Sequence, residues 1–363
     1  MKRGLVIGKF YPPHRGHHFL IETAAEQIDQ LDVLVCWKEE QTIPGELRAQ
    51  WIREEHSDRP NVRVLTVRDF GDDDNSAAWA SCTKDVLGYA PDVVFTSEDY
   101  GEPFARLLGA THVMVDRSRQ RFPVSGTTVR ADPRRFWTQL SLPARAWYAI
   151  RVAIVGAEST GTTTLARALA EHYRTTWVPE YGREYCEQLI LNGESVEDDR
   201  WRTEEFVHIA ETQAAREDLA ARNCNGIVFC DTEAIATSIW HERYVGYESF
   251  EVNSLAKPHK YALYVLTDQD IPFVQDGLRD GERIREWMTE RFTQKLNDAS
   301  VPWVRASGSH QKRMHIVTTA IEDLREVRLG PIQDTASTSS SSHGYRDKVT
   351  TDGDGSIDFK GGG

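Results

Sequence analysis

Short apolar runs alternate with amphipathic stretches along the first part of this chain. After the first run, apolar residues recur at helical spacing over residues 19–28 and predict a helix. Strands that alternate with helices are typical of a parallel α/β sheet. The strands of this part are predicted at residues 5–7, 32–36, 62–67 and 93–97.

The same pattern starts again after residues 141–148, where a proline interrupts the chain. We therefore expect a first domain over residues 1–140 and a second α/β domain over residues 150–328. From residue 330 the chain is rich in Ser, Thr, Gly and Asp, which predicts a disordered tail over residues 330–363. The second group of elements comprises strands at residues 152–155, 227–229 and 263–267 and a helix at residues 165–173.

The chain has 363 residues and a formal net charge of −13. Its length suits two domains, and its acidity argues against non-specific nucleic-acid binding, which depends on Lys and Arg. No apolar run reaches the roughly 18 residues of a membrane span, and no secretory signal precedes the first strand. The five cysteines form no C-x-x-C pair. We expect reduced thiols, a cytoplasmic location, no membrane span and no nucleic-acid partner.

Residues 8–17 read G-K-F-Y-P-P-H-R-G-H, between the first predicted strand and the first predicted helix. Backbone N–H groups and the positive end of the helix dipole point at an anion in such a place. Gly8 lets the backbone approach a ligand, and His14 and His17 can donate hydrogen bonds to phosphate oxygens. The alternative is a Gly/Pro turn with two surface histidines. The complete spacing G-x-F-x-P-x-H-x-G-H favours the phosphate site.

A second motif, residues 125–130, reads S-G-T-T-V-R near the end of the first domain. Ser125, Thr127 and Arg130 can place two hydroxyls and a guanidinium on phosphate oxygens at a helix start. Alone, the hexapeptide is also typical of a helix cap followed by Arg. The two motifs together resemble the nucleotidyltransferase superfamily, which makes NAD, coenzyme A and FAD by adenylyl transfer on a Rossmann-like sheet. In that resemblance His14 and His17 hold the triphosphate of ATP.

A glycine-rich segment, residues 156–164, reads G-A-E-S-T-G-T-T-T between a predicted strand and a predicted helix. This is the setting of a P-loop, whose pattern is G-x-x-x-x-G-K-[ST]. Thr162 stands at the lysine position, which removes a point charge from the β and γ phosphates and should weaken ATP binding. Thr163 stands where the magnesium-binding hydroxyl belongs. A glycine-rich connection without a nucleotide is the alternative.

Three later segments carry further polar groups. Asp231 follows a predicted strand, where a general base or magnesium-organising carboxylate would lie, although such an Asp is often a cap or turn residue. Residues 178–184 read V-P-E-Y-G-R-E, and a solvated loop is the alternative there. A Gly-bearing segment, residues 268–285, contains arginines that could close over phosphates, or could form a solvated face. These arginines are Arg279, Arg283 and Arg285.

Together, the two halves resemble the NadR-type bifunctional proteins of NAD synthesis, in which a nicotinamide mononucleotide adenylyltransferase is followed by a ribosylnicotinamide kinase. The kinase loop there is similar to G-x-E-S-x-G-K-[ST]-T. This resemblance spans roughly residues 1–325 and implies a Rossmann-like nucleotidyltransferase domain followed by a P-loop kinase-like α/β domain. Some members carry an N-terminal helix-turn-helix repressor domain, which we do not expect here. The matching stretches are Glu158, Ser159 and Gly161, E-Y-x-R-E at residues 180–184, Asp231-Thr232, and I-P-x-V-Q-D-G-x-R at residues 271–279.

The resemblance implies two reactions. In the first, ATP transfers its adenylyl group to nicotinamide mononucleotide, giving NAD and pyrophosphate. In the second, ATP phosphorylates nicotinamide riboside, with an activity that the missing lysine impairs. Mg²⁺ is expected to accompany ATP in both. A homo-oligomer and a functional link to a riboside transporter are further expectations.

The resemblance also assigns roles to individual residues. Catalysis falls to His14, His17 and Asp231, and metal binding to Thr163 and Asp231. Trp51 could stack on a pyridinium ring, with a core position on a helix as its alternative. ATP and phosphate binding falls to Gly8, Lys9, Phe10, Ser125, Thr127, Arg130, Gly156, Glu158, Ser159, Gly161, Thr162, Thr163, Thr164, Arg279 and Arg283. Substrate binding falls to Trp51, Glu180, Tyr181, Arg183 and Asp276.

Two other functions stay open. An adenylyltransferase for pantetheine phosphate or FMN would carry the same first-domain motifs, although the kinase-like half favours nicotinamide. A second domain without its lysine could also be a regulatory module that only senses nucleotide. A compensating cation near the loop would argue against this, and the sequence offers Arg167, Lys257 and Lys260. In the tail, residues 352–358 resemble part of a calcium loop but lack both key acidic ligands.

Overall fold

A computed structural model describes residues 1–69, 75–196, 200–257, 260–276, 279 and 281–328. The predicted disordered tail, residues 330–363, and its calcium-like stretch lie outside the described residues. Gly277 and Leu278 of the I-P-x-V-Q-D-G-x-R stretch also lie outside them.

The first sheet is built from the N-terminal part of the chain. Its five strands are all parallel and have the order β3-β2-β1-β4-β5. β1 is therefore central, and the first motif follows directly from its carboxyl end. The strands are β1 (Arg3–Gly8), β2 (Gln30–Trp37), β3 (Val62–Arg68), β4 (Val93–Thr96) and β5 (Thr111–Met114).

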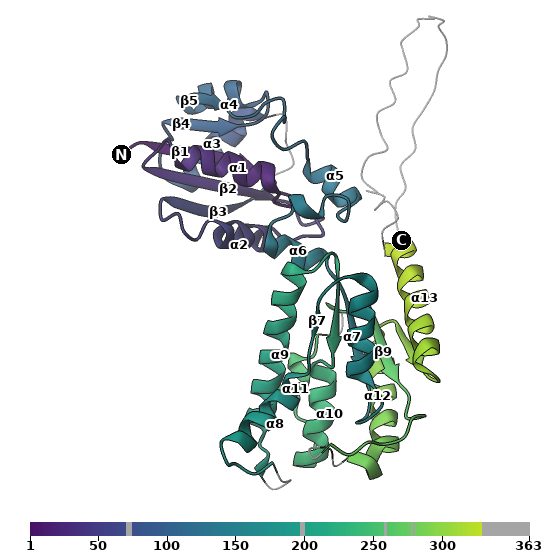
Figure 1. The fold of residues 1–363 in the computed structure, drawn as a ribbon. Helices are drawn as coiled ribbons and strands as arrows, with labels where there is room; N and C mark the ends of the chain where they lie inside the picture. The colour runs from purple at the N-terminus through teal and green to yellow at the C-terminus, as the bar shows by residue number, and fades with distance from the viewer. Residues whose placement is uncertain (70–74, 197–199, 258–259, 277–278, 280, 329–363) are drawn as a thin grey trace, which may run out of the picture. The chain divides into compact units, whose positions relative to one another are not determined.

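Helices cover both faces of this sheet (Figure 1). Neighbouring side chains of a strand point to opposite faces, so Val6 packs with residues of α1 and α2, whereas Leu5 packs with residues of α3 and α4. This two-sided burial explains why the strands read as continuous apolar runs. The helices are α1 (Arg15–Ala25), α2 (Gly45–Glu55), α3 (Ser76–Leu87), α4 (Gly101–Leu108), α5 (Gly126–Ala131) and α6 (Leu142–Tyr148), with a 3₁₀ helix η1 (Trp137–Gln139).

The second sheet also has five parallel strands, in the order β10-β9-β6-β8-β7. β6 is central, and the carboxyl ends of β6, β8 and β9 lie at one edge, where ligands bind in open α/β sheets. The strands are β6 (Ile150–Val155), β7 (Trp177–Val178), β8 (Ile227–Asp231), β9 (Leu263–Thr267) and β10 (Trp303–Ala306).

This second sheet is covered on both faces as well. Val152 and Ile154 pack with residues of α7 and α13, whereas Ala153 and Val155 pack with residues of α10 and α12. The helices are α7 (Thr162–Tyr173), α8 (Tyr181–Leu191), α9 (Thr203–Asn223), α10 (Ala234–Val245), α11 (Phe250–Leu255), α12 (Arg285–Asp298) and α13 (His310–Arg328), with a 3₁₀ helix η4 (Gly281–Ile284).

The predicted fold class is confirmed: both halves are α/β with parallel sheets. Three strands escaped the sequence analysis. β5 and β10 are short edge strands with partly exposed side chains, and β7 has only two residues, so none gives a continuous apolar run. Within the described part of the chain, no helix is long and apolar enough to cross a membrane.

Candidate functional site

The first motif forms the turn between β1 and α1. His14 is the N-cap residue of α1, and its carbonyl accepts hydrogen bonds from the backbone N–H groups of His17 and His18, at 2.8 and 3.1 Å. This turn stacks the His14 and His17 rings with their centroids 3.7 Å apart. The Nδ1 atoms of both rings are buried and have no hydrogen-bond partner among the described residues. Two imidazoles are thus presented together at the start of a helix.

Both imidazoles are neutral at pH 7. Burial lowers the pKa of His14 from 6.5 to about 4. Burial and the neighbouring His14 ring lower the pKa of His17 well below its usual value. A neutral imidazole has one N–H to donate, so each ring can give one hydrogen bond to an anionic ligand.

The second motif lies against the first. Arg130 of α5 donates a 2.5 Å hydrogen bond from Nη1 to the carbonyl oxygen of Tyr11, and its guanidinium lies 4.2 Å from the Tyr11 ring centroid. A Cβ at Gly126 would collide with the same carbonyl oxygen, so glycine is required there. Arg130 also donates to Thr127 Oγ1 at 3.4 Å. The structure therefore brings Thr127 and Arg130 to the histidine-bearing turn, as the sequence predicted for a shared phosphate site.

Ser125 has a clear structural task. It is the N-cap residue of α5, and its Oγ accepts the Thr128 N–H at 3.2 Å while Thr128 Oγ1 accepts the Ser125 N–H at 3.0 Å. This capping box is the alternative weighed for the hexapeptide. A phosphate contact from Ser125 would have to share its hydroxyl with the cap.

The other predicted residues of the first domain lie at various depths. Lys9 is about half exposed, with Nζ 4.0 Å from Asp69 Oδ2. Phe10 is buried in the sheet core and packs edge-on against His17, with ring centroids 5.0 Å apart. Trp51, on α2, is only 5 % exposed and packs in an apolar cluster with Val129, which favours its core alternative.

Arg48 organises the same turn and was missed by the sequence analysis. Its side chain is fully buried and donates from Nη1 to the carbonyl of Lys9 and from Nη2 to Gln41 Oε1 at 2.7 Å. Burial lowers the pKa of this guanidinium to about 10. An isolated Arg within G-E-L-R gives no signal, because its partner in the motif turn, Lys9, lies 39 positions away in the sequence.

The glycine-rich segment forms the turn between β6 and α7. Gly161 is the N-cap residue of α7 with φ 87°, a left-handed conformation that favours glycine. A Cβ at Gly156 would collide with Thr267 Oγ1. Both glycines of the loop are therefore required by its geometry. The residue at the lysine position, Thr162, is the first residue of α7.

Thr163 and Asp231 meet at this loop. Thr163 Oγ1 donates a 2.5 Å hydrogen bond to Asp231 Oδ2 at the end of β8. Asp231 is buried, and burial raises its pKa to about 6. Its Oδ1 has no partner among the described residues. A hydroxyl and a carboxylate are the hard oxygen ligands that Mg²⁺ takes, so the pair fits that ion. The described residues contain no group of three or more His, Cys, Asp or Glu side chains placed to hold a metal.

The arginine-bearing segment contacts the glycine loop directly. Glu158 Oε2 accepts the Gly281 N–H at 2.7 Å, and Ser159 Oγ accepts the Val274 N–H at 2.8 Å. Arg285 donates from Nη2 to the carbonyl oxygens of Ile271, at 3.1 Å, and Ser159, at 3.5 Å. Its buried Nε has no partner in the described structure.

A cluster of charged residues lies beside the loop. Asp276 accepts a 2.8 Å hydrogen bond from Arg183 Nη1, and its Oδ2 lies 3.3 Å from Arg279 Nε. Burial, then the charges of Asp231 and Glu158, raise the pKa of Glu180 to about 8. Predicted residues from three separate stretches of sequence thus meet in one place.

Three further predictions in this half have different outcomes. Tyr181 is buried in an apolar cluster with its hydroxyl 3.1 Å from His208 Nε2, so packing accounts for its position. Thr164 and Arg283 have exposed side chains. Of the cations offered to replace the lysine, Arg167 lies over Trp177 at 5.8 Å, Lys260 pairs with Asp218 at 3.7 Å, and Lys257 has an exposed side chain. The structure instead places Arg285 at the loop.

Both halves of the chain are similar in sequence to known proteins. Residues 151–313 match the AAA domain family. The chain is 28 % identical over 325 residues to the trifunctional NAD biosynthesis/regulator protein NadR of Escherichia coli K12, covering 83 % of this chain and 78 % of the relative. It is 28 % identical over 297 residues to the protein of the same name from Salmonella typhimurium LT2, covering 76 % and 71 %.

Solved structures show a similar fold. A crystal structure of NadR protein in complex with NR has a TM-score of 0.70 at 21 % identity and covers 89 % of this chain and 96 % of its own. Another, in complex with NAD and AMP-PNP, has a TM-score of 0.67 at 22 % identity and covers 90 % and 96 %. Sequence similarity over most of the chain supports a NadR-type protein, and the solved NadR structures have the same overall fold.

Proposed function

We propose that the first site transfers the adenylyl group of ATP to nicotinamide mononucleotide and so forms NAD. The stacked His14–His17 pair carries this proposal, because it presents two neutral imidazoles at the start of α1 beside the guanidinium of Arg130. Similarity to curated NAD biosynthesis/regulator proteins supports an enzyme of NAD biosynthesis in the broad sense.

The chemistry asks for positioning and charge stabilisation. A phosphate oxygen of the mononucleotide attacks the α-phosphorus of ATP, and the bond to the leaving pyrophosphate breaks as the new P–O bond forms. No covalent enzyme intermediate is needed. His14 and His17 would donate hydrogen bonds to the triphosphate, and Lys9 and Arg130 would add positive charge. Mg²⁺, when bound with ATP, supplies further charge neutralisation on the phosphate oxygens.

For the second site we infer a weak kinase that phosphorylates nicotinamide riboside. The 5′-hydroxyl oxygen would attack the γ-phosphorus of ATP, ADP would leave, and the hydroxyl proton would pass to Asp231. A carboxyl with a pKa of about 6 is largely ionised at pH 7 and can accept that proton. Thr163 and Asp231 would hold Mg²⁺, and the arginines near Asp276 would contact the phosphates.

The position of Arg285 favours kinase activity even though the loop has no lysine. Its guanidinium touches the loop at Ser159, and its Nε is buried without a partner among the described residues. A ligand phosphate would satisfy that donor. We propose that this arginine replaces part of the missing lysine charge.

A second candidate is a nucleotide-sensing domain without kinase activity. Thr162 favours it, because a threonine hydroxyl brings no charge to the β and γ phosphate oxygens. In this case the second site would bind ATP or NAD and leave the riboside unchanged.

One experiment separates these functions. The full chain is incubated with Mg²⁺ and ATP, once with nicotinamide mononucleotide and once with nicotinamide riboside, and the products are separated by chromatography. NAD from the mononucleotide supports adenylyl transfer, and mononucleotide from the riboside supports the kinase. Product from neither substrate would overturn both assignments.

Matched variants locate each reaction. His17→Ala should lower the rate of NAD formation by about 10²–10³ and leave riboside phosphorylation unchanged. Asp231→Asn should abolish riboside phosphorylation and leave NAD formation unchanged. If either variant affects both reactions equally while its melting temperature is unchanged, the assignment of one reaction to each site is wrong.

A further inference from the structure

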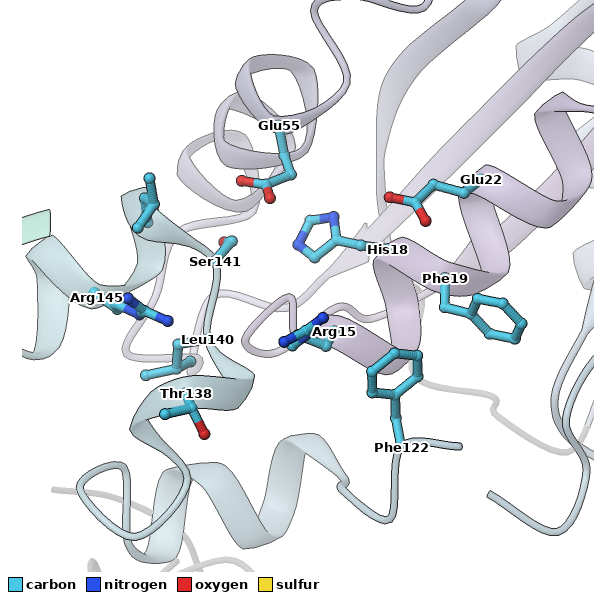
Figure 2. Close-up of a pocket in the computed structure, with 11 residues that line it drawn as sticks. Arg15, His18, Phe19, Glu22, Glu55, Phe122, Thr138, Leu140, Ser141 and Arg145 are labelled. Atoms are coloured by element: carbon cyan, nitrogen blue, oxygen red, sulfur yellow. The ribbon is translucent and has the colours of Figure 1, made fainter. Parts of the chain in front are cut away.

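A cavity of about 260 Å³ lies beside α1, outside both sites described above. It is lined by α1, by the end of α2, by Phe122 and by residues 138–145. Neither His14 nor His17 lines it. Figure 2 shows that its charged side chains converge from different elements: Arg15 and Glu22 from α1, Glu55 from α2 and Arg145 from α6.

These four charged side chains are near one another but do not form close ion pairs. In the part of the chain that the structure describes, none of them belongs to an ion pair within 4.0 Å. Arg15 lies over the Phe122 ring at 5.3 Å, and Arg145 donates from Nε to the Trp137 carbonyl at 3.2 Å. Both guanidinium groups are therefore held by contacts that leave their charge unpaired.

Two buried polar atoms face the same cavity. His18 and Ser141 are each only 5 % exposed, and neither His18 Nε2 nor Ser141 Oγ has a hydrogen-bond partner among the described residues. His18 is fixed on its other side by a 3.0 Å hydrogen bond between Nδ1 and His56 Nε2. Buried polar groups are normally paired, so these atoms indicate a ligand or ordered water that completes them.

The carboxylates have no cation in ion-pair contact. Burial, and then the charges of Glu22 and Glu54, raise the pKa of Glu55, and the charges of Arg145 and Arg15 offset this only in part. Burial lowers the pKa of His18 to about 3, so this ring is neutral and does not compensate the carboxylates. A positively charged ligand group between Glu22 and Glu55 would relieve their repulsion.

We propose that this cavity binds a small zwitterion of the free α-amino acid class, with its carboxylate on Arg15 and Arg145 and its ammonium group on Glu22 and Glu55. The charged lining sums to zero, so a simple anion is repelled by the carboxylates and a simple cation by the guanidinium groups. The volume lies just below the range of roughly 300–1,000 Å³ for drug-sized ligands, which suits a molecule of amino-acid size. Phe19, Phe122 and Leu142 also line the cavity and would contact an aliphatic side chain.

The test uses the full chain and three matched probes. L-leucine carries both charges, 3-methylbutylamine lacks the carboxylate, and 4-methylpentanoic acid lacks the amine. Titration calorimetry and saturation-transfer NMR are run up to about 10 mM, which covers millimolar dissociation constants. We expect saturable binding of L-leucine and at least about tenfold weaker binding of both analogues, since each loses hydrogen bonds to charged groups. Absence of saturable leucine binding, or equal binding of an analogue, overturns the proposal.

Variants then place the ligand. Arg145→Gln and Glu55→Gln should each weaken leucine binding by about tenfold to a hundredfold. Arg53→Gln and Glu26→Gln remove exposed ion pairs on α2 and at the end of α1, and should leave binding unchanged. Circular dichroism and melting temperature establish that each variant is folded, and Ser141→Ala replaces any variant that is not. Equal binding by the cavity variants and the controls would overturn the assignment of the site.

Discussion

Arg130 donates a 2.5 Å hydrogen bond to the carbonyl oxygen of Tyr11, although the two residues are 119 positions apart in the sequence. This contact fastens the second motif to the turn that carries His14 and His17. A guanidinium has five N–H donors, so Arg130 keeps others for a phosphate. The residue therefore positions the turn, and we propose that it also contacts the phosphates of ATP.

Replacing Arg130 tests this double task. Arg130→Ala should raise the apparent KM for ATP, because a guanidinium on phosphates contributes binding in ground and transition states alike. Arg130→Lys should recover little of the loss, since an ammonium group cannot stack on Tyr11 and bridge to phosphate in the same geometry. Steady-state NAD formation over a range of ATP concentrations measures both variants. An unchanged ATP dependence in Arg130→Ala would remove Arg130 from the site.

His17 should matter for the rate rather than for the fold. We expect His17→Ala to lower the rate of NAD formation by about 10²–10³, the usual loss for one preorganised donor to developing charge. His56→Gln is a matched control, because His56 is a buried histidine whose ring contacts His18 and not the phosphate turn. A folded His17→Ala protein with nearly wild-type turnover would contradict the assignment.

Sequence patterns predicted the parts of this molecule whose signal is local. Strand β1 and the turn at His14 were placed correctly, because an apolar run and a spaced motif do not depend on distant residues. Arg48 was missed because its partner Lys9 is brought near only by the tertiary fold. For Trp51 the sequence already offered a core position on a helix, and its packing with Val129 favours that position.

The cation at the glycine loop is the clearest example of a feature that the sequence pattern could not predict. Arg167 is close to the loop in sequence, but α7 turns its side chain toward Trp177. Arg285 is 126 positions from Ser159 and still reaches its carbonyl. The arginines that reach the loop, Arg285 and Arg313, are brought there by the tertiary fold, and the spacing of residues in the sequence does not specify this.

Glu217 should make stability depend on pH. This buried carboxyl of α9 accepts hydrogen bonds from Tyr261, at 2.5 Å, and Gln213, at 3.1 Å, and burial raises its pKa from 4.5 to about 7. The folded protein therefore binds more protons than the unfolded chain between these values. The stabilisation is complete below about pH 4.5 and is lost as the pH rises to about 7.

Glu217→Gln should remove this dependence, because an amide does not ionise. Urea unfolding followed by tryptophan fluorescence at pH 5 to 8, where Glu217 titrates, should show a smaller fall of the free energy of unfolding in Glu217→Gln than in wild type. The exposed Glu211 on the same helix provides the control Glu211→Gln. Glu180 and Glu233, with pKa values raised to about 8, act in both proteins, so some dependence persists. Parallel curves for wild type and Glu217→Gln would contradict the prediction.

Thr162→Lys should increase riboside phosphorylation. The loop has Gly161 in the left-handed conformation and Thr163 paired to Asp231, as we expect of a phosphate-binding loop, and Thr162 stands at the lysine position. A hydrogen bond to a charged group contributes about 1.5–3 kcal/mol, so kcat/KM for ATP should rise by roughly tenfold to a hundredfold. Arg285→Gln should lower the same quantity in wild type and lower it less in Thr162→Lys, because the new lysine then supplies the charge. The four proteins form a double-mutant cycle measured at several ATP concentrations. If wild type already turns over at about 1–100 per second and Thr162→Lys gains nothing, the claim of impairment is wrong, and a strong effect of Arg285→Gln would then identify the group that performs the lysine's task.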